Sequence, residues 1–301
     1  MAIPVVNLSP ITGSGRGRIA PPGRRVELAG RGTTYVREVD GPRGAPTVVL
    51  LHGWCATAGL NWFRVFDPLA AHFHVVAPDL RGHGRGVRGP GVFRLHDAAD
   101  DVAELLLTLG TGPVIPVGYS MGGPIAQLLW KRHRDLVSGL VLCATAARFM
   151  PGGRERVMFT SAMAAAAGGT RIGGIAARIP GPHRVWPALA RSLRTGTLPE
   201  WAAAEVRRHD LRLVLEAGHS IGTYNAQRWI GDIDVPTAAV VTVADKTVAP
   251  NRQREMAHAI PGATIHEVDD GHLACANPSF ATPLLDACLD VANRDATLRL
   301  A

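Results

Sequence analysis

The residues best suited to chemistry lie in a glycine-flanked turn, Gly118–Gly123, which reads Gly-Tyr-Ser-Met-Gly-Gly. An apolar run with β-branched residues, Val114–Val117, precedes the turn, and a helix-forming stretch, Pro124–Arg132, follows it at once. A Gly-x-Ser-x-Gly turn between a strand and a helix forces the serine into a strained conformation that lifts its hydroxyl above the sheet edge. The pattern therefore predicts that Ser120 is a nucleophile.

An acid and a histidine follow later strand-like runs in the same manner. Asp245 comes directly after Ala238–Val243, and His272 comes shortly after Thr264–Val268. In open α/β sheets, reacting groups gather outside the carboxyl ends of the strands. We therefore expect a serine, an acid and a histidine to meet at one edge of the sheet.

The elements that would position these residues are short, continuously apolar runs separated by helical patterns. Such runs are typical of strands buried on both faces, and their alternation with helices predicts a mostly parallel, doubly wound α/β sheet of about eight strands. One residue departs from this pattern. Pro116 lies in the predicted central strand, where proline removes a hydrogen-bond donor. The predicted strands are Val26–Leu28, Thr34–Val39, Thr47–Leu51, His74–Ala77, Val114–Val117, Leu140–Cys143, Ala238–Val243 and Thr264–Val268.

One long segment interrupts the alternation. Residues 148–230 have no strong strand pattern but several helix-like pieces, so we expect a helical cap inserted over the sheet. The α/β core would then comprise residues 26–147 and 231–293. Residues 1–25, rich in Pro, Gly, Ser and Arg, are expected to form a flexible arm, and residues 294–301 a tail.

Together these motifs resemble the α/β-hydrolase fold serine hydrolases, in the group of esterases, lipases and cofactor-free haloperoxidase-like enzymes. The resemblance covers roughly residues 26–293, and the order nucleophile, acid, histidine is the signature of that family. It implies the α/β-hydrolase fold and a covalent acyl-enzyme intermediate. The matching residues are His52-Gly53, Asp79–Gly84, Gly118–Gly123, Asp245 with Val248–Pro250, and Gly271-His272.

The resemblance implies a role for each member of the site. A serine hydroxyl needs a base, so His272 would take the Ser120 proton, and Asp245 would orient the imidazole and stabilise its cation. The backbone N–H groups of Met121 and Trp54 would form the oxyanion hole, where one donor typically lowers the barrier by about 3–4 kcal/mol.

Several residues compete for these roles or lie beside them. Asp269 and Asp270 are rivals for the acid role, although their closeness to His272 in sequence suggests that they shape its loop. His52 and Asp79 are expected to brace the loops that flank the pocket.

The substrate is expected to be a small-molecule or lipid carboxylic ester with an apolar acyl part. Apolar side chains of the cap can line a cleft over Ser120, or can simply pack the cap helices against each other. Three uses of the fold remain open: acyl transfer or perhydrolysis with the same triad, cleavage of a C–C bond, and non-catalytic ligand binding. The expected pocket residues are Tyr119, Met150, Met158, Phe159, Met163 and Trp186.

Composition limits the other functional classes. The formal net charge is +7, but the arginines are scattered, so no nucleic acid is expected and a weak contact with anionic membrane surfaces fits better. The four cysteines form no Cys-x-x-Cys pair and no His-Glu-x-x-His motif is present, so neither a metal nor a cofactor is expected. No apolar leader is visible, and we expect a cytoplasmic enzyme.

Overall fold

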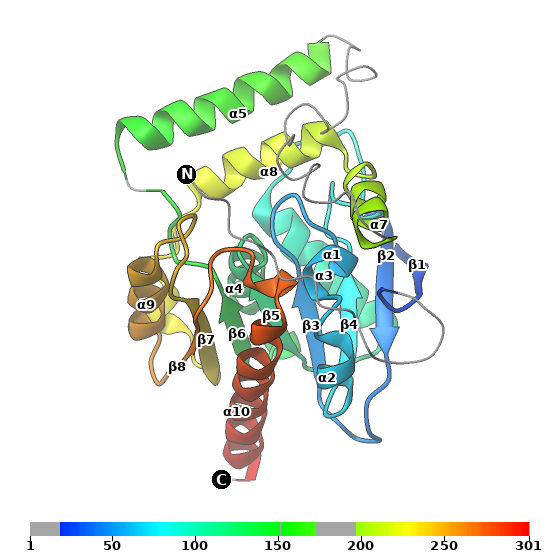
Figure 1. The fold of residues 1–301 in the computed structure, drawn as a ribbon, viewed down its shortest axis with the longest axis vertical. Helices are drawn as coiled ribbons and strands as arrows, with labels where there is room; N and C mark the ends of the chain where they lie inside the picture. Colours follow the sequence, from blue (N-terminus) through cyan, green and yellow to red (C-terminus); the bar gives the residue numbers. More distant parts are fainter. Residues whose placement is uncertain (1–18, 151, 173–196, 301) are drawn as a thin grey trace.

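The computed structural model describes residues 19–150, 152–172 and 197–300, and it contains a single eight-stranded sheet (Figure 1). The strand order is β1-β2-β4-β3-β5-β6-β7-β8. β2 pairs antiparallel with β1 and β4, whereas the pairs from β4 through β8 are parallel. The mostly parallel sheet predicted from the sequence is thereby confirmed. The strands are β1 (Gly23–Leu28), β2 (Gly32–Val39), β3 (Thr47–Leu51), β4 (His74–Pro78), β5 (Ile115–Tyr119), β6 (Leu140–Cys143), β7 (Thr237–Thr242) and β8 (Thr264–Val268).

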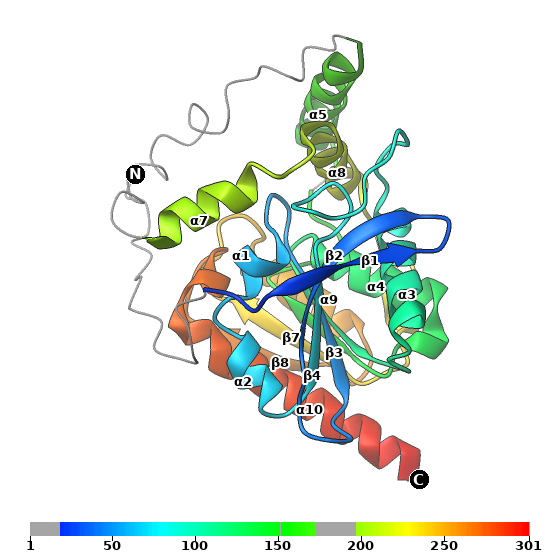
Figure 2. The ribbon, with the colours of Figure 1, turned by 90° about the vertical axis from the view of Figure 1, so that its right-hand side faces the viewer.

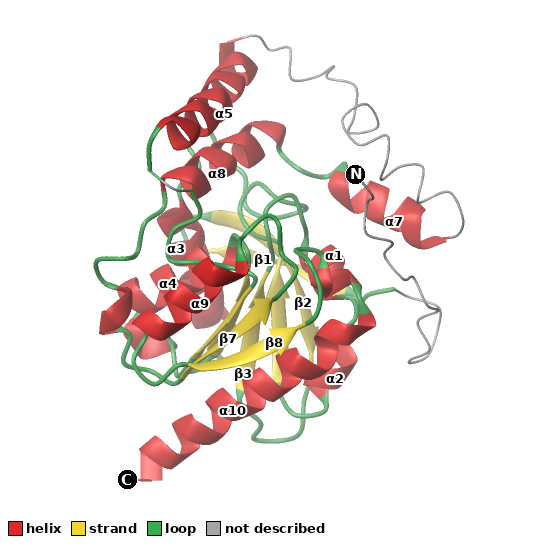
Figure 3. Cartoon of the chain, turned by 60° about the vertical axis from the view of Figure 1, so that its left-hand side comes forward, coloured by secondary structure: helices red, strands yellow, loops and turns green. Residues whose placement is uncertain are grey.

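Helices cover both faces of the sheet, as Figure 3 shows. All five residues of β3 are buried, because successive side chains point to opposite faces and both faces are covered. Val49 and Leu51 pack on one side in a core with α3 and α4, whereas Val48 and Leu50 pack on the other side with α2 and α10. The helices are α1 (Ala58–Trp62), α2 (Phe66–Ala70), α3 (Leu95–Leu109), α4 (Gly122–Arg132), α5 (Arg154–Ile172), α7 (Thr197–Val206), α8 (Leu211–Thr223), α9 (Pro250–Ala259) and α10 (Ala281–Leu300).

The segment between β6 and β7 contributes the helices α5, α7 and α8. Figures 1 and 2 show α5 and α8 side by side beyond one end of the sheet, with α7 closer to α1. The chain leaves the core and returns to it at adjacent points. The Ala226 N–H donates to the Ala147 carbonyl over 2.8 Å, which joins the two ends of this segment.

Two terminal boundaries differ from those expected. β1 begins at Gly23, inside the segment 1–25 that we expected to be an arm, and its pairing with β2 starts at that residue. At the other end, α10 runs through Leu300, although we expected a tail from residue 294. Arg294 stabilises this last part of the helix, since its guanidinium donates to the Thr237 carbonyl over 2.8 Å and to Asp290 over 3.0 Å.

Pro116 is accommodated in the central strand β5 because of how that strand is paired. It faces Val49 of β3 in the register, whereas pairing of β5 with β6 begins only at Val117. The N–H groups of Val114 and Ser120 both donate towards the β6 side, each over 2.9 Å. Since alternate residues of a strand direct their N–H groups to the same neighbour, the Pro116 nitrogen faces the stretch where the β6 ladder has not yet begun.

Candidate active site

Ser120 lies in the sharp turn between β5 and α4 and has a φ of 50°, a left-handed conformation that costs a non-glycine residue free energy. Its surroundings hold it there. Its N–H donates to the Cys143 carbonyl over 2.9 Å, and its carbonyl accepts from the Thr145 hydroxyl over 2.8 Å. Gly118 is required because a side chain there would collide with the Gly122 carbonyl oxygen. The sequence motif therefore forms the strained turn that it predicted.

The structure brings Ser120, His272 and Asp245 into one chain of contacts. The Nε2 atom of His272 lies 3.0 Å from the Ser120 Oγ, and its Nδ1 lies 2.7 Å from Asp245 Oδ2. In the neutral ring, Nδ1–H donates to the carboxylate and leaves Nε2 free to accept from the serine hydroxyl. This is the geometry that a base-assisted nucleophile needs.

Asp245 is held by hydrogen bonds to its buried carboxylate. The N–H groups of Thr247 and Val248 donate to Oδ1 over 2.7 and 2.9 Å, and the Thr242 hydroxyl donates to Oδ2 over 2.8 Å. Burial alone would raise the pKa of Asp245, but the hydrogen bond from His272 and those from the two amides outweigh it, so the pKa lies below its ordinary value. The carboxylate is therefore ionised beside His272 at neutral pH.

The two rival acids take other positions. Asp270 accepts from the Gly271 N–H over 2.6 Å and from the Asn277 amide over 2.5 Å, so it shapes the loop before His272. Asp269 is exposed. Of the three candidate acids, Asp245 is the one whose carboxylate contacts the imidazole.

The loop after β3 lies against the serine. A Cβ atom placed on Gly53 would lie 3.5 Å from the Ser120 Cβ, so Gly53 lies against the nucleophile. Trp54 is the next residue in the chain, and its backbone therefore begins beside Ser120. Within the described part of the chain, neither the Trp54 N–H nor the Met121 N–H donates to a backbone carbonyl. Both expected oxyanion donors thus have no competing backbone acceptor among those residues.

This loop is fixed from two directions. From the core, the Asn61 side chain accepts from the Gly53 N–H over 2.9 Å. From the cap, the Trp54 indole donates to the Val214 carbonyl over 2.8 Å, and the His209 Nε2 lies 3.1 Å from the Cys55 carbonyl. Nothing in the sequence near Asn61 or His209 pointed to these contacts, which depend on how distant segments pack.

His52 and Asp79 brace the loops beside the site, as expected. His52 accepts from the Leu80 N–H over 2.9 Å and lies 2.8 Å from the Gly53 carbonyl, while burial lowers its pKa to about 3. Asp79 accepts from the Ala58 and Arg85 N–H groups, each over 2.9 Å. These two side chains connect loops to each other.

The expected pocket residues separate into different environments. The Phe159 ring packs edge-on against Trp54 at 6.4 Å, and Met163 lies beside the same indole near Gly218. Met150 is partly buried, whereas Met158 is 60% exposed on α5. Trp186 lies outside the described residues.

Tyr119 does not line a pocket. Its side chain is buried among Trp62, Phe280 and the His272 ring, and its hydroxyl donates to the His272 carbonyl over 2.8 Å. Its place at the end of β5 directs it into the core on the same face as Val117. Tyr119 therefore positions the histidine loop instead of contacting a cleft.

The described residues include no group of three or more His, Cys, Asp or Glu side chains placed to hold a metal ion. No described helix combines the length and the apolar character needed to cross a bilayer.

Comparisons with known proteins concern the family and the fold of the chain. A family model described as alpha/beta hydrolase fold matches residues 46–277. The pimeloyl-[acyl-carrier protein] methyl ester esterase of Chromobacterium violaceum is 44% identical over 105 residues, which cover 35% of this chain and 39% of that protein. A soluble epoxide hydrolase of Corynebacterium sp. is 39% identical over 95 residues, covering 32% of this chain and 33% of that protein. The match thus spans only about two fifths or less of these curated relatives.

Solved structures match over almost the whole chain. A hydrolase from Pseudomonas aeruginosa PA01 aligns with a TM-score of 0.74 at 21% identity, covering 90% of this chain and 98% of that one. The enol-lactonase from Burkholderia xenovorans LB400 aligns with a TM-score of 0.68 at 23% identity, covering 90% of this chain and 100% of that one. At such identities the likeness concerns the fold.

Proposed function

We propose that this chain, which belongs to the alpha/beta hydrolase fold family, is a hydrolase that cleaves a carboxylic ester with an apolar acyl part by way of a Ser120 acyl-enzyme. The observation that carries this proposal is the continuous contact from Asp245 through His272 to Ser120, with separations of 2.7 and 3.0 Å. Ester hydrolysis is the reaction that this arrangement supports best.

The proposed reaction follows from the donors and acceptors at the site. His272 Nε2 takes the proton of Ser120 as Oγ attacks the ester carbonyl, and the amides of Met121 and Trp54 stabilise the oxygen that becomes negative. The imidazolium then protonates the departing alcohol, which leaves the acyl group on Ser120. Water, deprotonated by the same nitrogen, releases the acid and restores the serine.

The apolar acyl preference rests on the side chains nearest the oxyanion loop. Phe159 and Met163 contact or approach Trp54, so an acyl chain bound at Ser120 would meet apolar surface on the cap side. The named activity of the Chromobacterium violaceum relative, a methyl ester esterase, supports a carboxylic ester as the substrate class. A small-molecule or lipid ester and a cytoplasmic location belong to the same proposal.

The direct test is covalent labelling of the purified protein with a fluorophosphonate. We expect one label on Ser120 and none in the Ser120→Ala variant, because the probe reacts only with an activated serine. Ser161→Ala, which alters an exposed serine of α5, serves as the matched control and should label like the wild type. Persistent labelling of Ser120→Ala, or an unlabelled wild type, would refute the serine mechanism.

The acyl preference needs a separate measurement. A series of p-nitrophenyl esters with increasing acyl length should show kcat/KM rising with chain length, because each buried methylene adds about 0.8 kcal/mol of favourable transfer free energy. A flat or falling series would leave the serine chemistry intact and remove the apolar acyl part from the proposal.

A further inference from the structure

A cavity of about 680 Å³ lies apart from Ser120, Asp245 and His272, none of which lines it. Its lining residues come from β1 and β2, from the loop that follows β4, and from the segment directly after α7. Five arginines contribute to its wall: Arg25, Arg85, Arg88, Arg207 and Arg208. We call this cavity the arginine pocket.

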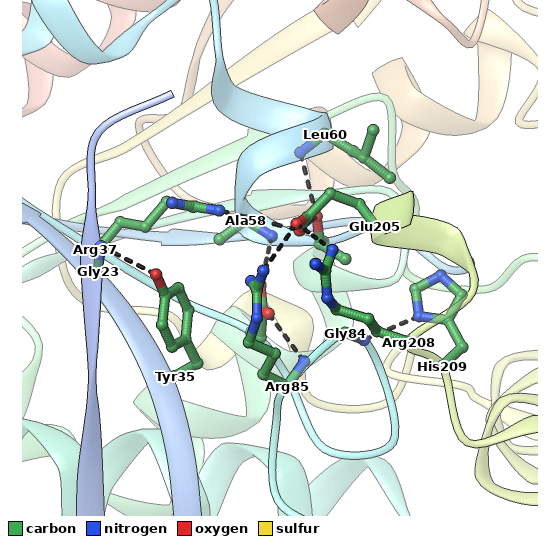
Figure 4. A network of polar contacts seen from close by, with 12 residues as sticks. Gly23, Tyr35, Arg37, Ala58, Leu60, Gly84, Arg85, Glu205, Arg208 and His209 are labelled. Carbon is green, nitrogen blue, oxygen red and sulfur yellow. Dashed lines mark hydrogen bonds and ion pairs between the residues drawn. The ribbon is translucent and has the colours of Figure 1, made fainter. Parts of the chain in front are cut away.

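The ion pairs beside the arginine pocket hold more positive than negative charge (Figure 4). The Glu205 carboxylate, 2% exposed, lies 3.0 Å from the Arg85 guanidinium and 2.7 Å from that of Arg208. Arg37 approaches the same carboxylate to 3.8 Å. One carboxylate thus serves three guanidinium groups. The buried Asp79 carboxylate, which accepts from the Arg85 N–H over 2.9 Å, is a second acid beside them, so the cluster keeps an excess of at least one positive charge.

The remaining arginines of the wall have no carboxylate partner within the described residues. Arg88 donates only to the carbonyls of Gly84 and Arg208. Arg25 and Arg207 are exposed, and the side chain of neither has a hydrogen bond or ion pair to another described residue. Each side chain therefore retains guanidinium donors that a bound anion can use.

Guanidinium groups select for phosphate, because their planar fork matches two phosphate oxygens at once. The concave shape suits a small molecule, and a volume of about 680 Å³ lies within the range of small-ligand pockets. A single phosphate would leave most of this space empty and would reach only part of the arginine wall. We propose that the arginine pocket binds a small organic anion that carries at least two phosphate groups.

Isothermal titration of the full chain with tripolyphosphate, at about 0.15 M ionic strength, tests this proposal. We expect one molecule to bind per chain, and to bind more tightly than inorganic phosphate. The Arg25→Gln/Arg207→Gln variant should bind at least about tenfold more weakly, because each charge-assisted hydrogen bond contributes substantially to affinity. Neither side chain supports the fold through a hydrogen bond or ion pair to a described residue, so thermal unfolding should match that of the wild type.

The matched control is Arg43→Gln/Arg228→Gln, which removes the same charge from exposed positions away from the pocket. It should bind tripolyphosphate like the wild type. No binding by the wild type, or an equal loss in both variants, would overturn the proposal. Tighter binding of poly-glutamate than of tripolyphosphate, lost in Arg25→Gln/Arg207→Gln, would overturn it too, since it would assign the arginines to an acidic protein segment.

Discussion

At the scale of single residues, His272 contacts three separately positioned groups. Its ring joins Asp245, which follows β7, to Ser120, which follows β5, and its carbonyl accepts from Tyr119 of β5. A shift of the ring would therefore change two hydrogen bonds together. The residue that holds the tautomer, Asp245, is expected to matter nearly as much as the base itself.

Asp245→Asn tests that expectation. The amide cannot hold the imidazole in the tautomer that leaves Nε2 free, so we expect kcat for a p-nitrophenyl ester to fall by ~10⁴-fold with little change in KM. Asp269→Asn removes a rival carboxylate from the exposed position near His272 and should change kcat by no more than about threefold. The reverse pattern would assign the acid role to Asp269.

The same carboxylate gives a pH-dependent difference in stability. Because the folded state lowers the pKa of Asp245, the ionised form contributes stability above the ordinary carboxyl value of 3.8, and that contribution is lost as pH falls through the folded value. The difference in unfolding free energy between the wild type and Asp245→Asn should therefore shrink below about pH 4. Urea titrations between about pH 6 and 3 measure it; a difference that grows on acidification would contradict the assignment.

Individual residues were predictable from the sequence where a local pattern determines them. Ser120 and Asp245 follow the buried strands β5 and β7, and His272 follows the partly exposed edge strand β8. Parallel strands bring their carboxyl ends to one edge. Tyr119 was placed wrongly in the pocket, although strand alternation puts it on the same face as the buried Val117. Asn61 and His209 were missed, because no local pattern marks a side chain that braces a distant loop.

At the scale of elements, α7 contacts the core through the Trp201 ring, which packs against Phe63, and through one buried charged side chain, Glu205. Glu205 meets Arg85 from the loop after β4 and Arg37 from β2, and it accepts from the Thr57 hydroxyl ahead of α1 over 3.1 Å (Figure 4). A helix of the cap thus depends on charges that the core supplies.

Glu205→Gln should therefore destabilise the protein strongly. Removing one partner of a buried ion pair leaves uncompensated charge, and we expect a loss of about 3–5 kcal/mol in the free energy of unfolding. Glu267→Gln alters a carboxylate that is also paired with an arginine but is 53% exposed, so its cost should stay below about 1 kcal/mol. Equal midpoints of denaturant unfolding for the two variants would show that the Glu205 pairs contribute little.

Strands β3, β6 and β8 have the bounds that the sequence predicted, whereas the start of the first strand and the end of the last helix differ from the expected ones. Runs such as Thr47–Leu51 are apolar throughout because the sheet is covered on both faces. The start of β1 at Gly23 was not predicted, because Arg24 and Arg25 are exposed and give no apolar pattern. The extension of α10 likewise depends on Arg294, whose contacts with β7 are not visible in the sequence.

At the scale of the whole molecule, cap and core share one apolar interior. Leu213 of α8 is buried beside Gly82 and belongs to the same cluster as residues of α3, α4 and β3. The order of the strands in the sheet, in which β4 lies between β2 and β3, was not predicted. Which strands become neighbours in a sheet depends on long-range packing.

This shared interior predicts that cap and core unfold together. Leu213→Ala should lower the free energy of unfolding by about 2–5 kcal/mol and shift a single calorimetric transition to lower temperature. Leu211→Ala truncates a side chain on the same helix that is 38% exposed, and its effect should remain within about 0.5 kcal/mol. A separate low-temperature transition in Leu213→Ala would show that the cap melts by itself.

The backbone hydrogen bond from Ala226 to Ala147 has a consequence for how such a protein can change over generations. The intervening segment leaves and rejoins the core at neighbouring points, and the entropy of closing such a loop grows only with the logarithm of its length. Insertions, deletions or recombination between these two points can therefore remodel the cap while Ser120, Asp245 and His272 stay where they are. A replacement segment would need to supply new anchors in place of Glu205 and Leu213, and a lineage could then acquire new substrates without rebuilding its chemistry.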